Sequence, residues 1–359
     1  MKLLIITQKV DQNDQLLGFF IDWLKRFAER FEKVIVLCLE KGEFNLPENV
    51  KVISLGKERG VSKLKQFFNF YFLIFTLSKD YDNVFAHMNP IWVVLGSIPW
   101  RLLGKKIYFW YTHKAVTLKL RLAEKMADVI FTASKESFRI ESEKVVVTGH
   151  GIDTELFKPY FSRSNLKEEA LRFDLGVIKI LSVGRIAPVK NYGTLIDAAK
   201  ILKDRGVYFS ITMVGEAALE QDKEYEKSLK LKVKSLKLED SFNFVGKIDH
   251  KDLPRYYQSN DIFVHLSKTG SVDKALLEAM ACRTKVLSSN DSAKAFLPAS
   301  LIFNENNSSE LVEKIIILSS QEVDPSLREY VIKNNNLDNL IDKISKIIND
   351  SNISLPAQQ

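Results

Sequence analysis

Leu181-Ser-Val-Gly-Arg-Ile-Ala-Pro-Val-Lys-Asn191 has the pattern of a buried strand that turns directly into a helix. Residues 178–183 are apolar and rich in β-formers, which predicts the strand. Gly184 permits a tight exit, and Pro188 suits the loop or first turn before the helical pattern of residues 192–205. Because α/β proteins bind phosphates at such turns, the segment predicts an α/β fold with an anion site.

Two cations follow the glycine of this turn. Arg185 and Lys190 are placed to direct positive charge at one point, beside the backbone N–H groups of the helix start. Such a pocket can hold a diphosphate without a metal ion. An ordinary strand–helix turn with two solvated cations fits this stretch equally well, so a second stretch has to decide between the two interpretations.

That second stretch is Ser267-Lys-Thr-Gly-Ser-Val-Asp-Lys-Ala-Leu-Leu-Glu-Ala-Met-Ala-Cys282, which follows a strand predicted at residues 262–266. It repeats the order strand, turn, helix. Glu278 lies in the first two turns of the predicted helix, where a carboxylate can accept two ribose hydroxyls. The helix entry offers hydroxyls and N–H groups that can bind a phosphate or cap the helix, at Thr269, Gly270 and Ser271.

Together the two stretches resemble the retaining nucleotide-sugar glycosyltransferases of glycosyltransferase family 4, which have the GT-B fold. The resemblance runs nearly end to end. It implies an α/β chain of two Rossmann-like domains, each a doubly wound parallel sheet, facing each other across a cleft. The motifs that carry it are Gly149-His-Gly-Ile-Asp153 followed by Phe157-Lys-Pro159, Gly184-Arg185 with Lys190-Asn191, Val245-Gly246 after a strand, and Leu277-Glu278-Ala279-Met280-Ala281.

The resemblance also implies which residues bind the donor. Arg185 and Lys190 would hold its diphosphate and Glu278 its ribose, and two strand-end glycines would border the nucleotide base. The donor-binding residues expected on this basis are Gly184, Arg185, Lys190, Asn191, Gly215, Val245, Gly246, Thr269, Gly270, Ser271, Lys274, Leu277 and Glu278.

One position departs from the family pattern. The family has a motif in which seven residues separate two glutamates, and the first of these glutamates reaches the transferred sugar. In this sequence Gly270 stands at the position of that first glutamate. Asp273 and Lys274 are the best substitutes for that contact if the loop folds inward. Asp273 can equally be an acid favoured by the helix dipole, and both interpretations stay open. The catalytic residues expected are His113, Arg185, Lys190 and Asp273.

The acceptor side of the cleft is expected in the first half of the chain. His87 and His113 each follow a predicted strand, at the carboxyl edge where such folds bind ligands. His113 matches the family's strand-end histidine near the transferred sugar, whereas a structural role for His87 fits as well as an acceptor role. The loop at residues 7–17 should line the cleft, although Gly18 alone stands where many family members have a Gly-Gly pair. The cleft residues expected are Asp14, Gln15, Gly18, His87 and His113.

Strands and helices alternate throughout the chain, as doubly wound sheets require. We expect an acceptor-side domain at residues 1–165, a nucleotide-sugar donor domain at 166–335, and within 336–359 a helix that packs back on the first domain, followed by a frayed tail. Apolar runs predict strands at 2–6, 33–39, 51–55, 84–86, 107–111, 129–132 and 145–148, and then at 178–183, 208–214, 242–245, 262–266, 285–288 and 301–303.

Composition agrees with a two-domain globular protein. The chain has 359 residues, of which 46% are hydrophobic, enough for two ordinary cores. Its two cysteines are too few for a disulfide framework and fit a reducing cytoplasm. Its first residues predict a strand rather than a secretory signal, and its longest apolar runs fall short of the roughly 20 residues of a membrane-spanning helix. A cytoplasmic protein is therefore expected.

The net charge of +7 is unevenly distributed, because residues 1–167 carry +8 and the remainder −1. Without a basic stripe interleaved with stacking aromatics, nucleic acid is not an expected partner. Peripheral contact with an anionic membrane, or a lipid-phosphate acceptor, fits the basic half. Scattered solvated lysines explain the charge as well. The basic residues that flank the aromatic and apolar runs are Lys63, Lys65, Arg101, Lys105 and Lys106.

These patterns predict a glycosyltransferase that moves a sugar from a nucleotide-diphosphate sugar to a glycan or lipid-linked acceptor in cell-surface polysaccharide biosynthesis. Retention is carried over from the resemblance. No cofactor and no metal are expected, because the Gly-x-Gly-x-x-Gly fingerprint is missing and no histidine shares ligand spacing with a second ligand. Two alternatives are an inactive nucleotide-sugar-binding protein, suggested by Gly270, and a GT-B epimerase that acts on a nucleotide sugar alone.

Overall fold

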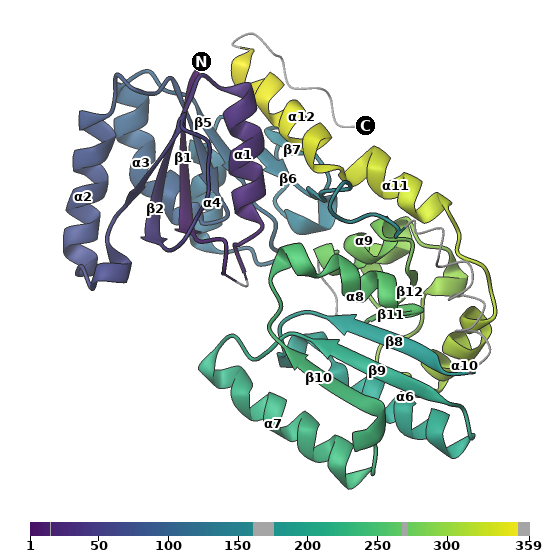
Figure 1. Cartoon of the computed structure of the whole chain (residues 1–359). Coiled ribbons are helices and arrows are strands. Elements are labelled where there is room, and N and C mark those ends of the chain that lie inside the picture. The colour runs from purple at the N-terminus through teal and green to yellow at the C-terminus, as the bar shows by residue number, and fades with distance from the viewer. Residues whose placement is uncertain (15, 161–175, 268–271, 351–359) are drawn as a thin grey trace. The chain divides into compact units, whose positions relative to one another are not determined.

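The computed structural model describes residues 1–14, 16–160, 176–267 and 272–350 (Figure 1). Contacts divide the chain into two compact units. The first unit consists of Met1–Gly151 together with the segment that begins at Asn336, and the second is Ile152–Asn335. The first unit is therefore discontinuous in sequence, whereas the second is continuous.

The first unit is built on a seven-stranded parallel sheet, and all seven strands predicted for this half are present. Because helices cover both faces, the central strands are nearly continuous apolar runs. The strand order reverses between β1 and β4, where Leu4 pairs with Val84. The spatial order is β3 (Val50–Ser54), β2 (Lys33–Lys41), β1 (Lys2–Val10), β4 (Asn83–His87), β5 (Ile107–Trp110), β6 (Val129–Thr132) and β7 (Val145–Val147).

The two faces of this sheet carry different helices (Figure 1). On one face lie α1 (Phe20–Arg30) and α12 (Leu337–Asn349), and on the other α2 (Lys63–Thr76), α3 (Pro90–Leu102) and α4 (Leu118–Met126). The last three begin where a side chain caps the first turn, because Ser62, Asn89 and Thr117 each accept a backbone N–H there.

The last helix completes the core of the first unit. α12 packs against α1, and Arg30 of α1 pairs with Asp338 and Asp342 of α12. The apolar residues of α12 recur at helical spacing and are buried: Leu337, Leu340, Ile341, Ile344, Ile347 and Ile348. The chain thus returns to the first unit after it has built the second.

The second unit contains a five-stranded parallel sheet. Its order is β10 (Phe242–Gly246), β9 (Phe209–Val214), β8 (Ile178–Val183), β11 (Ile262–His265) and β12 (Lys285–Ser288). Its helices are α6 (Tyr192–Asp204), α7 (Glu220–Ser235), α8 (Pro254–Ser259), α9 (Lys274–Ala281), α10 (Ser308–Ser319) and α11 (Ser326–Asn335).

The sixth strand predicted for this half, at residues 301–303, is wrong. The 3-10 helix η7 (Ala299–Leu301) follows Pro298 and takes up the start of the segment. Only Ile302 then forms a bridge, with Ser288.

The other 3-10 helices are η1 (Lys57–Arg59), η2 (Lys135–Ser137), η3 (Pro188–Lys190), η4 (Glu239–Ser241), η5 (His250–Asp252) and η6 (Asp291–Ala295). Across the described ranges, no helix combines the length and the apolar character that crossing a membrane requires.

The boundary between the units lies after Gly151, earlier than the expected position near residue 165. Ile152 and Phe157 are buried in the core of the second unit. The Ile152 N–H donates to the Asn335 carbonyl at 2.8 Å, and Arg328 donates to the Phe157 carbonyl at 3.0 Å. These bonds join the two ends of the second unit, so the segment after Gly151 belongs to it.

Candidate active site

The two stretches singled out in the sequence follow neighbouring strands of the second sheet and meet at the carboxyl ends of those strands. β8 and β11 are neighbours where the strand order reverses, and the chain leaves their carboxyl ends in opposite directions. Gly184 follows β8, and Ser267 lies just after β11. In open α/β sheets ligands bind at such a switch point, which makes this edge the candidate site.

Three strand-end glycines shape the turn after β8. Gly184 has a φ of +148° and Gly215 a φ of +132°, values that L side chains rarely adopt. A Cβ on Gly215 would lie 2.1 Å from the Gly184 carbonyl oxygen. The Gly215 N–H in turn donates to Gly246 at 2.8 Å. The ends of β8 and β9 therefore approach more closely than a side chain on Gly215 would allow.

This close approach predicts unequal effects of two alanine substitutions. Gly215→Ala should destabilise the second unit by roughly 2–5 kcal/mol, because it combines backbone strain with a collision at Gly184. Gly246→Ala is the matched control: its φ is +78°, but no atom lies within 4 Å of the added Cβ, so the loss should be about 1–2 kcal/mol. Urea unfolding of both variants measures the difference. Equal losses would show that Gly215 does not hold the turn.

Two residues of the following segment lie close to the Gly184 turn. The hydroxyl of Tyr192, which is buried, donates to the Gly184 carbonyl at 3.1 Å. Lys190 Nζ lies 3.5 Å from the point where a Cβ on Gly184 would stand. The Lys190 ammonium therefore lies over the glycine turn, where it can bind an anion that approaches the backbone of the turn.

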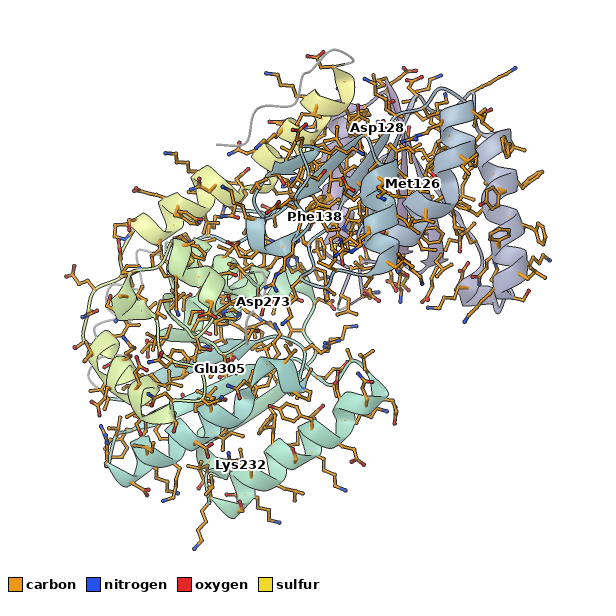
Figure 2. The ribbon with its side chains drawn as sticks, turned by 180° about the vertical axis from the view of Figure 1, so that it is seen from behind. Met126, Asp128, Phe138, Lys232, Asp273 and Glu305 are labelled. Atoms are coloured by element: carbon orange, nitrogen blue, oxygen red, sulfur yellow. The ribbon has the colours of Figure 1, made fainter. Side chains whose placement is uncertain are left out.

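Lys190 forms an ion pair with Asp273. Asp273, which is labelled in Figure 2, precedes α9. The same carboxylate oxygen accepts hydrogen bonds from Ser267 Oγ at 2.6 Å and from His265 Nε2 at 2.9 Å. Burial would raise the pKa of Asp273, but the Lys190 ammonium and the His265 hydrogen bond hold that pKa well below its usual range. The structure thus joins two of the residues that the sequence analysis expects to be catalytic, 83 positions apart.

His265 is a member of this group that the sequence reasoning missed. It is buried at the end of β11, and its Nδ1 lies 3.0 Å from Ser288 Oγ on β12. An ionised carboxylate only accepts, so His265 donates its Nε2–H to Asp273 and, when neutral, accepts the Ser288 hydroxyl through Nδ1. The sequence offered no signal for this contact beyond a polar residue in an apolar strand.

Arg185 has a different partner from Lys190. Its Nε lies 3.7 Å from Oδ2 of Asp222, a buried residue in the first turn of α7. The sequence directs both cations at one point, whereas in the structure each of them pairs with its own carboxylate.

Glu278 lies in the second turn of α9 and is buried. Its Oε2 accepts the Tyr257 hydroxyl at 3.0 Å, and its Oε1 lies 3.0 Å from His250 Nε2. Burial, and then the charge of Glu278, raise the pKa of Tyr257 well above its usual value, so this hydroxyl stays protonated and donates. Tyr257 and His250 were not predicted, because they lie outside the motifs. Tyr257 reaches Glu278 through the packing of α8 beside α9, and His250 lies on η5, which packs beside α8.

The remaining donor-site candidates lie around the same sheet edge or in its core. Asn191 adopts a left-handed conformation before α6 and donates to Asn306 at 3.0 Å. Lys274 begins α9, Val245 lies near the end of β10, and Leu277 is buried in the core of the second unit. Thr269, Gly270, Ser271 and, in the first unit, Gln15 lie outside the described residues.

In the first unit, His87 ends β4 at the switch point beside β1. It is buried, its Nδ1 lies 3.1 Å from Thr7 Oγ1, and the Phe20 ring stacks on it with 3.9 Å between centroids. These contacts fit the structural interpretation of His87.

The other candidates of this unit lie in loops. His113 is exposed, and its Nδ1 accepts the Ala115 N–H at 3.1 Å. Asp14 accepts the N–H groups of Leu16 and Leu17; partial burial raises the pKa of Asp14, but the Leu17 N–H and the Lys9 ammonium bring it below its ordinary value. A Cβ on Gly18 would lie 2.5 Å from the Asp14 carbonyl oxygen, so the single glycine allows this loop to close tightly.

One Asp-x-Asp sequence, Asp80-Tyr81-Asp82, occurs in the chain. It lies at the amino ends of the strands of the first sheet, whereas ligands of such sheets bind at the carboxyl ends. Asp80 pairs with Lys33 at 2.7 Å, and Asp82 accepts the Lys2 N–H at 2.7 Å, both at the starts of strands. In the part of the chain that the structure describes, no three His, Cys, Asp or Glu side chains lie close enough together to hold a metal ion.

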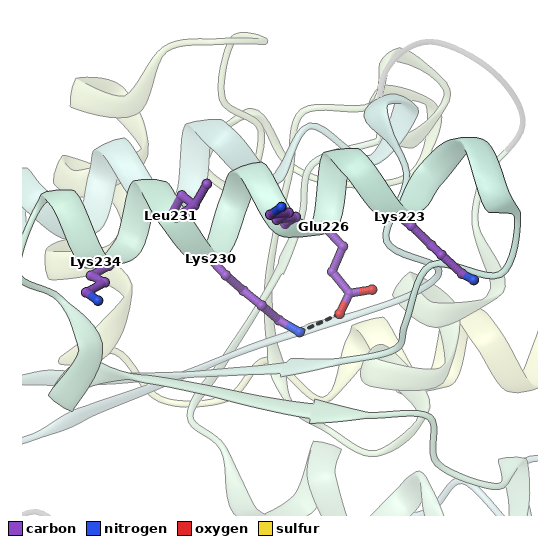
Figure 3. A pocket seen from close by; sticks show the side chains of 6 residues that line it. Lys223, Glu226, Lys230, Leu231 and Lys234 are labelled. Carbon is purple, nitrogen blue, oxygen red and sulfur yellow. Dashed lines mark hydrogen bonds and ion pairs between the residues drawn. The ribbon is translucent and has the colours of Figure 1, made fainter.

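A shallow hollow follows the outer face of α7 (Figure 3). Lys230 pairs there with Glu226 at 2.6 Å, and its ammonium lies over the Phe244 ring. The residues that line the hollow are Lys223, Glu226, Lys227, Lys230, Leu231 and Lys234. This is the solvated charged helix face that the sequence pattern indicates, and it shares no residue with the candidate site.

Comparison with known proteins identifies similar chains. A family model described as "Glycosyl transferases group 1" matches residues 164–358. Amylovoran biosynthesis glycosyltransferase AmsK of Erwinia amylovora is 35% identical over 158 residues, which cover 42% of this chain and only 35% of AmsK. The UDP-Gal:alpha-D-GlcNAc-diphosphoundecaprenol alpha-1,3-galactosyltransferase of Escherichia coli is 25% identical over 292 residues, covering 73% of this chain and 72% of that enzyme.

Among solved structures, Anabaena Alr3699/HepE in complex with UDP is similar over 97% of this chain and 99% of its own, with a TM-score of 0.77 and 18% identity. This likeness shows a shared fold of two parallel-sheet α/β units.

Proposed function

Because this chain belongs to the group 1 glycosyl transferases, we propose that it transfers a sugar from a nucleotide-diphosphate sugar to a glycan or lipid-linked acceptor. Its GT-B fold suits that reaction. The observation that carries the proposal is the cation of Lys190 over the Gly184 turn, at the switch point of the second sheet. Backbone N–H groups and an ammonium at such a point are suited to a diphosphate.

The chemistry follows from the leaving group. Negative charge develops on the donor diphosphate as the anomeric bond breaks, and preorganised cations stabilise that charge. Lys190 and Arg185 take this role. When the diphosphate binds Lys190, the carboxylate of Asp273 becomes available to a hydroxyl of the transferred sugar, the contact that Gly270 cannot make. Glu278, positioned by Tyr257 and His250, binds the ribose.

Retention, membership of glycosyltransferase family 4 and independence of metal ions are also part of the proposal. Retention without an enzyme nucleophile implies attack on the front face, with the departing phosphate oxygen helping to take the acceptor's proton. The relatives support the choice of acceptor, since one is named for amylovoran biosynthesis and another for an acceptor linked to diphosphoundecaprenol.

A turnover assay with UDP-, GDP- and ADP-sugars, with and without pooled glycan and lipid-linked acceptors, tests the function. Nucleoside diphosphate should be released only when an acceptor is present, at an undiminished rate in chelator, and the product should keep the donor's anomeric configuration by NMR. UDP-sugars come first, because HepE is described in complex with UDP.

Two of the possible failures point to another function. A donor interconverted without any acceptor would identify an epimerase, and a donor bound but never turned over would identify a binding protein. Activity that disappears in chelator and returns with manganese would contradict metal independence alone.

A further inference from the structure

The outer face of α2 exposes a row of large apolar side chains. Leu64, Phe68, Phe72 and Phe75 follow one another at helical spacing, and 67, 61, 67 and 50% of their surfaces are exposed. Phe70, on the opposite side of the helix, is fully buried. α2 is therefore apolar on both faces, although only one of them meets the core of the first unit.

The neighbouring helix extends this surface. Ile98 and Leu102, one turn apart on α3, are 68 and 80% exposed. α3 packs beside α2, and the Tyr71 hydroxyl donates to the Leu95 carbonyl at 2.9 Å. We call Leu64, Phe68, Phe72, Phe75, Ile98 and Leu102 the α2–α3 surface. Apolar side chains gathered on adjacent helices mark interaction sites rather than ordinary solvated surface.

The charges beside this surface are basic. α2 contains no Asp or Glu, and Lys63 and Lys65 in its first turn are exposed. Arg101, between the two exposed residues of α3, is exposed as well. Asp80, the first acid after α2, is paired with Lys33 at 2.7 Å. A partner that fits must therefore combine an apolar layer with negative charge.

We propose that the α2–α3 surface docks on an anionic phospholipid bilayer. Phenylalanine and leucine side chains of a helix that lies in the membrane plane enter the boundary between headgroups and acyl chains, and lysines at its end attract acidic headgroups. A second copy of this chain would bring its own Lys63, Lys65 and Arg101 to the interface, so the charge favours the bilayer over self-association. Docking requires no turnover and is independent of the proposed transferase activity.

The first test is flotation with vesicles of one part phosphatidylglycerol to three parts phosphatidylcholine, and with vesicles of phosphatidylcholine alone. The protein should float with the acidic vesicles and be released by salt. Leu64→Gln, Phe68→Gln and Phe72→Gln together should weaken binding about ten-fold or more. The control replaces Tyr208, Leu231 and Ile317 by Gln; these residues of the second unit are similarly exposed, at 74, 58 and 57%, and their loss should not weaken binding.

A second measurement reports which residue enters the lipid. On acidic vesicles Phe72→Trp should gain a blue-shifted emission that brominated lipid quenches, whereas Tyr208→Trp should not. Equal binding to both vesicle types, no binding, or unchanged binding of the triple Gln variant would overturn the proposal. So would a concentration-dependent dimer that the triple Gln variant makes monomeric, because the surface would then bind a second copy.

Discussion

A chain that ends at Asn335 should lose the folded first unit while the second unit keeps its own structure. Truncation removes α12, whose six buried apolar residues complete one face of the seven-stranded sheet. Burial of such side chains contributes about 1.5–3 kcal/mol each, so their joint loss, of the order of 10 kcal/mol, is comparable to the whole stability of a domain. The second unit, Ile152–Asn335, retains all its strands and its core.

Hydrogen exchange resolved by peptide is the measurement. Peptides of β1, β2 and β4 should exchange rapidly in the truncated chain, and those of β8 and β11 should stay protected. A chain that ends at Asp350 is the control, since it keeps α12, and it should match the full chain. Protection of β1 in the shorter chain would contradict the structural role of α12.

Lys190→Ala should weaken nucleoside diphosphate binding by roughly ten- to a hundred-fold and slow transfer further. A charge-assisted contact contributes about 1.5–3 kcal/mol, and it strengthens as charge develops on the leaving group. The matched control is Lys200→Ala on α6, because Lys200 pairs with the exposed Asp204. Calorimetry with UDP, GDP and ADP measures the binding. Undiminished affinity for whichever diphosphate the parent binds would remove Lys190 from the site.

Asp273→Asn should change the same site in the opposite sense, because it removes the carboxylate that neutralises Lys190. We expect equal or tighter diphosphate binding together with lower turnover. The sign of the pH dependence follows from the depressed pKa of Asp273. The pair contributes stability above the ordinary Asp pKa and loses it only as the pH falls through the lower folded-state value. Ionisation of Asp273 should therefore not affect binding between roughly pH 5 and 8.

Strands and motif positions could be predicted because they depend on local patterns. Twelve of the predicted strands are present, since a short apolar run between turn residues is enough to identify a strand in a covered parallel sheet. Residues 301–303 show the limit of this rule. That run is as apolar as the others, but the turn after Pro298 leaves only Ile302 to pair.

Contacts inside the site could not be predicted in the same way. The pairing of Lys190 with Asp273 depends on β8 lying beside β11, and the bond from Tyr257 to Glu278 depends on α8 reaching α9. A single sequence carries no information about such long-range neighbours. The division after Gly151 depends on the same kind of contact, because Phe157 precedes a polar segment in sequence but is buried in the second core.

The discontinuous first unit has a consequence for synthesis on the ribosome. β1 to β7 emerge first, but on one face α1 alone covers their sheet until α12 emerges, after the whole second unit has been made. At 5–20 residues per second this delay lasts roughly 10–40 s. Tyr108 of β5, whose hydroxyl donates to the Ile347 carbonyl of α12 at 3.5 Å, lacks this partner during that time. The part made last among the described elements is thus required by the part made first, so the nascent chain should need a chaperone for longer than its length alone would suggest.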